Sequence, residues 1–215
     1  MKSKRLKHIK KCITLIKIGK VLQGYRYKYL YKVNIHKCVF KKTLFVHARF
    51  RAGSITHVNF NESNFKNIDF VSVNFKKSTF KNSHLNNVLF FSCNLTKVNF
   101  QNSKLENVIL INCKIKDVKN LDMSKVKIIS SQKDYNISDK LKNTMNKISN
   151  NKKLERFSIL FNTQHNINIT LINQLVIKYG EEECIRMLEH ININQRNIIY
   201  SFFDYVERFE KIKKI

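Results

Sequence analysis

Large apolar side chains recur at every fifth residue from Ile35 to Ile115 without an exception. A second series of mostly small residues lies two positions before each of them, from Val33 to Cys113. A period of five fits neither an α-helix, which repeats every 3.6 residues, nor a flat strand, which alternates every two. The pattern instead predicts a chain that turns at each five-residue unit. The pair of apolar and small residues then points inward, and the other three residues face water.

Four such units, or 20 residues, close one square coil, and the next coil stacks on it at about 4.7–4.9 Å. Because one unit cannot bury its apolar pair alone, several coils must share a continuous core. Gly53 occupies one of the small inward sites, where we expect a missing side chain to be tolerated. Residues 20 apart then form inner columns, in which stacked rings add aromatic contacts to the area they bury. The predicted columns are Phe40, Phe60, Phe80 and Phe100; Phe50, Phe70, Phe90 and Leu110; Phe45, Phe65, Leu85 and Leu105; and Ile35, Ile55, Phe75, Leu95 and Ile115.

Many of these units consist of a small residue, Asn, and then Phe or Leu, and this order resembles the pentapeptide-repeat family. The resemblance covers Val33 to Ile115, about four coils, and it implies a right-handed quadrilateral β-helix, which we expect over residues 33–118. The alternative is a disordered low-complexity segment, which would not keep two apolar registers over this length. The units that match best are Val58-Asn59-Phe60, Ser63-Asn64-Phe65, Val73-Asn74-Phe75, Cys93-Asn94-Leu95 and Val98-Asn99-Phe100.

Residues 1–32 and 119–136 flank the expected β-helix. The first segment is rich in Lys, and its apolar residues at 6, 9, 13 and 16 follow helical spacing. It is therefore predicted to be a basic arm whose helix caps the open end of the solenoid. Contact with a membrane or with nucleic acid is the alternative. The second segment follows no clear period and is predicted to be an irregular linker.

Residues 137–215 are predicted to form an α-helical domain of four or five amphipathic helices. Ser138 is expected to cap the first, and Asn194 the last. Gly180 suits the end of one helix, and the three glutamates that follow it suit the start of the next. A further helix is expected around the apolar residues Leu154, Phe157, Leu160 and Phe161.

Positive charge dominates the chain, which has 41 Lys and Arg against 15 Asp and Glu, a net charge of +26. Residues 1–118 carry 24 of these basic residues and 4 of the acidic ones, a net of +20. On the coil surface Lys37, His57, Lys77 and Lys97 should stack in one outer column, beside Lys76 and Lys116. Such a row suits the phosphates of a nucleic acid or an acidic protein surface. A solvated face in a Lys-rich protein is the alternative.

A second surface feature is apolar. Leu89, Phe91, Ile109 and Ile111 occupy outward positions on one side of the last two coils. Contiguous exposed apolar surface usually marks a docking site. The expected occupants are the C-terminal helical domain or a second copy of the chain, as in a homodimer.

Residues with catalytic or metal-binding spacing are not found in the sequence. The seven His show no metal-ligand spacing with one another or with Cys, and no phosphate-binding, dinucleotide-binding or nucleophile-elbow Gly motif occurs. We therefore expect no enzyme activity, cofactor or metal. Cys184 lies near an expected helix start, but its three Glu neighbours favour a buried structural thiol. Because no run of 18 apolar residues exists and the five Cys are scattered, no transmembrane segment and a cytoplasmic location are expected.

These features favour a non-enzymatic interaction scaffold, a rigid β-helix whose basic face binds an acidic protein or nucleic-acid partner. The resemblance adds two further hypotheses. Some members of the family are bacterial effectors that are secreted into host cells, and this is the main alternative. Others bind DNA gyrase as mimics of duplex DNA, but such a role requires an acidic surface, which the net charge of +20 contradicts.

Overall fold

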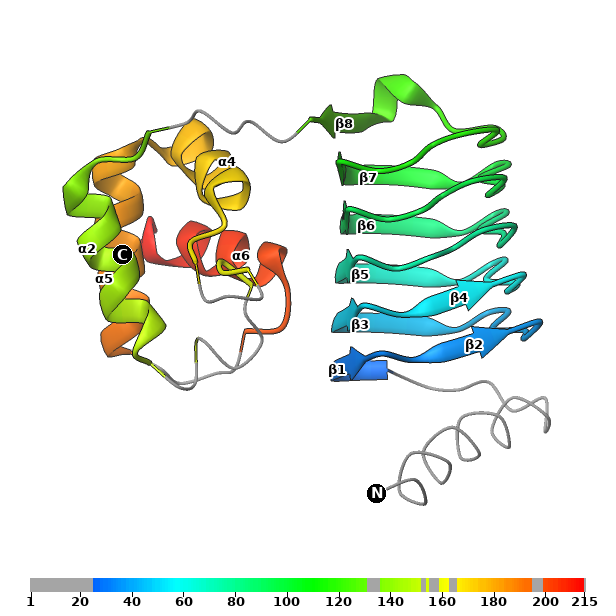
Figure 1. Cartoon of the computed structure of the whole chain (residues 1–215), viewed down its shortest axis with the longest axis horizontal. Coiled ribbons are helices and arrows are strands. Elements are labelled where there is room, and N and C mark those ends of the chain that lie inside the picture. The colour runs from blue at the N-terminus through cyan, green and yellow to red at the C-terminus, as the bar shows by residue number, and fades with distance from the viewer. Residues whose placement is uncertain are drawn as a thin grey trace, which may run out of the picture. The chain divides into compact units, whose positions relative to one another are not determined.

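The computed structural model describes residues 25–130, 136–151, 154, 159–162, 166–194 and 199–214, except for the side chains of residues 25–28. The chain divides into two compact units between Ser130 and Ser131. The first unit is a β-solenoid and the second is helical (Figure 1).

The solenoid is a stack of parallel strands of about five turns. Its main sheet has the strand order β1-β3-β5-β6-β7-β8, and β2 pairs with β4 in a second, smaller sheet. From β3 to β7, partners such as Phe45 and Phe65, or Leu85 and Leu105, are 20 residues apart, which confirms the predicted coil. The strands are β1 (Tyr25–Tyr31), β2 (Asn34–His36), β3 (Leu44–Arg51), β4 (Ser54–Thr56), β5 (Asn64–Val71), β6 (His84–Phe91), β7 (Lys104–Ile111) and β8 (Val126–Ile129).

The solenoid is longer at both ends than the sequence predicted. Strand β1 lies within the segment 1–32 that was expected to be a capping arm, and it pairs with β3. The expected linker 119–136 contains the 3₁₀ helix η1 (Met123–Lys125) and strand β8, which pairs with β7. Both predictions were therefore wrong over these residues. The basic helix expected near the N-terminus lies outside the described residues.

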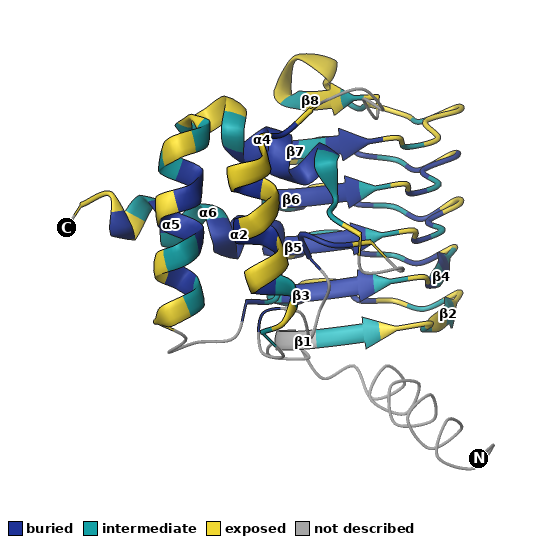
Figure 2. Ribbon diagram, turned by 60° about the vertical axis from the view of Figure 1, so that its left-hand side comes forward, coloured by how far each residue is buried: buried dark blue, intermediate teal, exposed yellow. Residues whose placement is uncertain are grey.

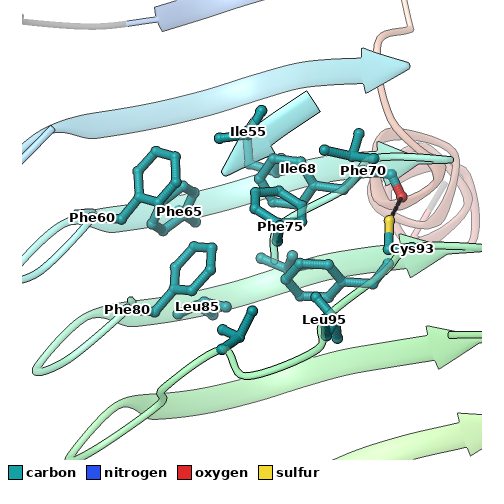
Figure 3. Packing of buried hydrophobic residues seen from close by; sticks show 14 of the residues in the cluster. Ile55, Phe60, Phe65, Ile68, Phe70, Phe75, Phe80, Leu85, Cys93 and Leu95 are labelled. Atoms are coloured by element: carbon teal, nitrogen blue, oxygen red, sulfur yellow. Dashed lines mark hydrogen bonds between the residues drawn. The ribbon is translucent and has the colours of Figure 1, made fainter. Parts of the chain in front are cut away.

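Stacked phenylalanine rings fill the centre of the coils (Figure 3). The ring centroid of Phe60 lies 5.5 Å from that of Phe40 and 5.0 Å from that of Phe80, and the rings are nearly parallel in both pairs. Phe45 and Phe65 stack at 4.7 Å, about the spacing of neighbouring strands. Side chains such as Phe70 and Phe80 are 1% and 0% exposed. The predicted inner columns are confirmed in these positions.

The small inward residues also form hydrogen bonds between coils. The hydroxyl of Ser78 donates to the carbonyl oxygen of Ile55 (2.8 Å), and that of Ser83 donates to Phe60 (2.8 Å). The thiol of Cys93 donates in the same way to the carbonyl oxygen of Phe70, at 3.2 Å (Figure 3). The small inward residues therefore leave room for the large ones and also donate side-chain hydrogen bonds to the backbone, each to the carbonyl oxygen 23 residues earlier.

Gly53 lies where the preceding coil comes close to the backbone, so its small size matters more than the sequence suggested. A Cβ added to it would lie 3.0 Å from the carbonyl oxygen of Val33 and 3.1 Å from the Cγ2 atom of that residue. The Val33 oxygen also accepts a hydrogen bond from the backbone N–H of Ser54 (2.8 Å). The preceding coil therefore approaches this backbone too closely for a larger residue to fit without a shift.

The helical unit contains α2 (Asp139–Ser149), α4 (Ile169–Tyr179), α5 (Glu181–Ile193) and α6 (Phe202–Ile212). Helices α2 and α4 both pack against α5. Ser138 caps α2 through its hydroxyl, which accepts from the N–H of Leu141, as predicted. Gly180, with φ of 83°, ends α4 immediately before the glutamates of α5, also as predicted. None of the helices described is both long and apolar enough to cross a membrane.

One expectation for the helical unit was wrong, and a second was wrong at the C-terminal end of a helix whose residue Leu154 is helical. Asn194 does not cap the last helix but ends α5, while Ser201 caps α6 in a capping box with Asp204. The Ser201 hydroxyl accepts from the Asp204 N–H at 3.1 Å, and the Asp204 carboxylate accepts from the Ser201 N–H at 3.0 Å. Leu160 and Phe161 belong to no helix, and Phe161 forms an antiparallel bridge with Ile167. Most of the helix expected around them lies outside the described residues.

Candidate polyanion interface

A left-handed backbone residue recurs at every fifth position of the solenoid, from Lys32 to Asp117, with φ between 49° and 62°. We call these residues the corners, because each lies two positions after an inward apolar residue, where the chain turns. None of them is Gly, and none is β-branched. Asn, Lys, Ser and His predominate among them, since Val, Ile and Thr are poorly accommodated at positive φ. A side chain at a corner necessarily lies on the outside of the coil.

Four successive corners make up one column of the stack: Lys37, His57, Lys77 and Lys97. Backbone hydrogen bonds hold this column in register. The N–H of Lys37 donates to the carbonyl oxygen of Thr56 (3.1 Å), and that of Lys77 donates to the carbonyl oxygen of Thr96 (3.0 Å). The N–H of Lys97 donates to the carbonyl oxygen of Lys116 in the next coil (3.0 Å). Because the same bond recurs in every coil, the four residues follow one another at a regular step of one coil.

We call Lys37, Lys76, Lys77, Lys97 and Lys116 the basic stripe. All five side chains are exposed, and Lys76 and Lys116 belong to the column directly beside the corner column. Within the described part of the chain, none of the five forms an ion pair with a carboxylate. Figure 2 shows exposed residues recurring from coil to coil at the end of the solenoid where β2 and β4 lie.

Lysines elsewhere on the solenoid are partly neutralised. The ammonium of Lys41 lies 2.8 Å from Glu62, and that of Lys42 lies 3.6 Å from the same carboxylate. Lys104 pairs with Glu106 at 2.6 Å. The lysines of the basic stripe therefore differ from Lys41, Lys42 and Lys104 in having no such ion pair within the described residues.

Two histidines, His36 and His57, lie in the same two columns as the lysines of the stripe. The rings of His36 and His57 meet edge to face at 5.0 Å, and His36 Nδ1 shares a hydrogen bond of 2.8 Å with Thr56 Oγ1. The pKa of His57 lies below its ordinary value, first because neighbouring atoms exclude water from the ring, and then because Lys77, His36 and Lys37 are positively charged. His57 is therefore largely neutral at pH 7, and protonation would add a cation to the column.

The four residues of the predicted docking patch come together on neighbouring strands. Leu89 on β6 is the register partner of Ile109 on β7, and Phe91 is the partner of Ile111. On the two adjacent strands the same column continues with Val71 and Ile129. The alternate residues of these strands enter the solenoid core, and the patch residues do not belong to that core. Its docking role stays a prediction.

Two further residues with chemically reactive side chains are Cys184 and His84, and the contacts of each are structural. Burial, followed by the charges of Glu181 and Glu183, raises the pKa of Cys184 to about 12, so its thiol is protonated at neutral pH. His84 Nε2 lies 3.0 Å from the carboxylate of Glu106, on the solenoid surface. Sequence reasoning missed the left-handed corners, although the lack of β-branched residues at every fifth position was a readable signal of them.

The comparisons with known proteins agree with the repeat. Residues 54–87 match the family model for pentapeptide repeats, with eight copies. No curated protein matches the chain. The chain is similar to the solved pentapeptide repeat protein alr5209 from Nostoc PCC 7120, with 17% identity and a TM-score of 0.35 over 56% of this chain and 94% of that one.

Two other solved structures are similar over comparable lengths. Rfr23 from the cyanobacterium Cyanothece 51142, a pentapeptide repeat protein, is 11% identical, with a TM-score of 0.29 over 58% of this chain and 96% of that one. QnrB1, a plasmid-mediated fluoroquinolone resistance protein, is 9% identical, with a TM-score of 0.15 over 53% and 92%. No enzyme family is indicated. The family-model match shows pentapeptide repeats within residues 54–87, and the solenoid around them is built of stacked 20-residue coils.

Proposed function

We propose that this protein is a non-enzymatic interaction scaffold that binds an acidic partner through the basic stripe. The observation that carries the proposal is the alignment of lysines without carboxylate partners along stacked corners. A solenoid core fixes the backbone beneath each of them, so little backbone conformational entropy is lost there on binding. Repeat solenoids characteristically offer such extended surfaces.

Charge alone does not identify the stripe, because the whole chain carries +26. A protein of this charge is attracted to any polyanion, and its affinity falls steeply with salt as counterions are released. The stripe must therefore be compared with equally exposed lysines elsewhere on the same solenoid. Lys66, Lys125 and Lys127 provide this control, since all three are exposed and lie outside the stripe.

The experiment measures binding of the full chain to heparin at several salt concentrations. Replacing Lys37, Lys77 and Lys97 by Gln should weaken binding and reduce the slope of log K against log salt by about two to three. The same change at the three control lysines should have a clearly smaller effect. Equal effects of the two triple variants, or no binding at low salt, would contradict the proposed function.

A further inference from the structure

We propose that the partner of the basic stripe is an α-helix that carries acidic side chains along one face, about one per turn. This inference rests on the proposed function and specifies its partner. It follows from the spacing of the cations, their chemistry and the charge at the end of the column.

The spacing of the corner column suits a helix. Its four residues are separated by three coil steps, or roughly 14–15 Å at the usual strand spacing. On an α-helix, residues i, i+4, i+7 and i+11 share one face and span roughly 16–17 Å. The mismatch is about 0.7 Å a step, which the long side chain of Lys easily absorbs. A row of four carboxylates on a straight helix can therefore lie along the whole column.

Other regular anions fit this column less well. Same-face side chains of an extended strand are roughly 6.6–6.8 Å apart, so their mismatch grows by about 2 Å at every step. The phosphates of duplex DNA rise about 3.4 Å per nucleotide along each strand and complete a turn in about ten, so they leave a straight line within this length. The corner column is straight because each coil repeats the same backbone hydrogen bond.

The chemistry of the stripe suits carboxylates and does not suit the reading of nucleic-acid bases. It consists of Lys, with two His beside it, and has no Arg, whose planar group binds phosphate and carboxylate in a bidentate manner. No Phe, Tyr or Trp lies in it to stack on bases. Lys pairs with carboxylates as a compact point charge, without a fixed orientation. A row of Glu or Asp on a helix needs only such contacts.

Asp117 occupies the next corner of the same column, with φ of 55°. It places a negative charge at the C-terminal end of the cationic run. A helix carries partial positive charge at its N-terminus. The bound helix should therefore lie with its N-terminus near Asp117 and its C-terminus near Lys37.

The test measures fluorescence anisotropy of labelled probes with the full chain. One probe is a cross-linked Ala-rich helical peptide of 20 residues with Glu at i, i+4, i+7 and i+11. A second has the same composition with its four Glu distributed around the helix, and the third is a 20-base-pair DNA duplex. The one-face peptide should bind about five- to tenfold more tightly than the distributed one, as two or three additional weak ion pairs would give.

Variants of the protein test where the peptide binds and in which direction the bound helix lies. Gln at Lys37, Lys77 and Lys97 should abolish the preference for the one-face peptide, whereas Gln at Lys66, Lys125 and Lys127 should preserve it. Asp117→Lys should tighten the binding of a peptide that is extended by one acidic turn at its N-terminus, and not of one extended at its C-terminus. Lys already occupies several corners, so this change suits the local backbone.

Two results separate the inference from the proposed function. If the peptides bind alike while DNA or heparin binding depends on the stripe lysines, the acidic-helix partner is wrong and the scaffold function stands. If no probe distinguishes the stripe variant from the control variant, both are wrong.

Discussion

Replacing Phe70 by Ala tests whether the stacked rings hold the coils together. Its side chain is 1% exposed and meets four other rings: Phe50 and Phe90 at 5.1 Å, Phe75 at 4.9 Å and Phe65 at 6.1 Å. Removal of a buried Phe ring costs about 3–5 kcal/mol. Because the fixed backbone of the coils cannot collapse into the cavity and several aromatic contacts are lost, we expect a value near the upper end, about 4–5 kcal/mol.

The assay combines urea unfolding, followed by far-UV circular dichroism, with native-state hydrogen exchange of the solenoid strands. Hydrogen exchange is needed because the two compact units need not unfold together. The loss of protection should be largest in β3, β5 and β6, since each coil contacts only its neighbours. Phe70→Leu keeps most of the volume and should cost less than about 1.5 kcal/mol.

Val39→Ala is the matched control, since Val39 is 54% exposed on the outside of a coil and should change stability by less than about 0.5 kcal/mol. A loss below about 1 kcal/mol for Phe70→Ala, with the dependence on urea unchanged, would refute a close-packed ring core.

Three further predictions concern the corners, the small inward sites and pH. Asn82→Val should destabilise the solenoid by about 1–2 kcal/mol, because Asn82 has φ of 54°, whereas Asn82→Gly and Lys81→Val should cost little in urea unfolding. Gly53→Ala should lower the free energy of unfolding by about 1–3 kcal/mol, because the new Cβ meets Val33, as the same assay would show. Heparin affinity should rise as the pH falls below about 6.5, the ordinary pKa of His, because protonation of His57 adds a cation to the corner column. The pKa of His57 is lowered, so the rise should come below that pH, and His57→Gln should reduce it.

Each of these predictions has a contrary outcome. Equal stability of the Val and Gly variants at residue 82 would show that left-handed geometry does not limit the corners. A Gly53→Ala protein as stable as the original would mean that the preceding coil yields easily. A pH dependence that the His57 variant leaves intact would assign the effect to other groups.

The middle of the solenoid was predictable because two inward series repeat there without interruption, whereas its ends break the pattern for different reasons. At the N-terminal end Tyr25 and Leu30 are the register partners of Phe45 and Phe50, but Lys28 occupies the position of a small residue and conceals the unit. At the C-terminal end Val126 pairs with Val108, only 18 residues earlier. A search for a fixed period of five cannot find this shortened coil.

The helical unit shows how a cap can be misplaced. Asn194 and Ser201 are both suitable N-cap residues, and helical periodicity alone does not distinguish between them. The acidic residue three positions after Ser201, Asp204, was the better signal, because it completes a capping box. Asn194 ends α5 instead, where its N–H donates to the carbonyl oxygen of His190.

The alignment of the stripe followed from the 20-residue register, since any two residues separated by one coil must stack. The sequence could not show which of its lysines have carboxylate partners. Glu62 lies closer in sequence to His57 of the corner column than to Lys41, yet it pairs with Lys41 and Lys42 across the coil interface. Such pairing depends on side-chain conformations, which leave no periodic trace in the sequence.

The common register of all columns limits how this protein can change its length during evolution. Insertion of one to four residues between β3 and β7 would move every later side chain into another column, so that polar residues would enter the core. Duplication of a complete 20-residue segment, such as 64–83, avoids this and adds one more cation at the corner copied from Lys77. The number of coils and the length of the basic stripe would then increase together in a single genetic event.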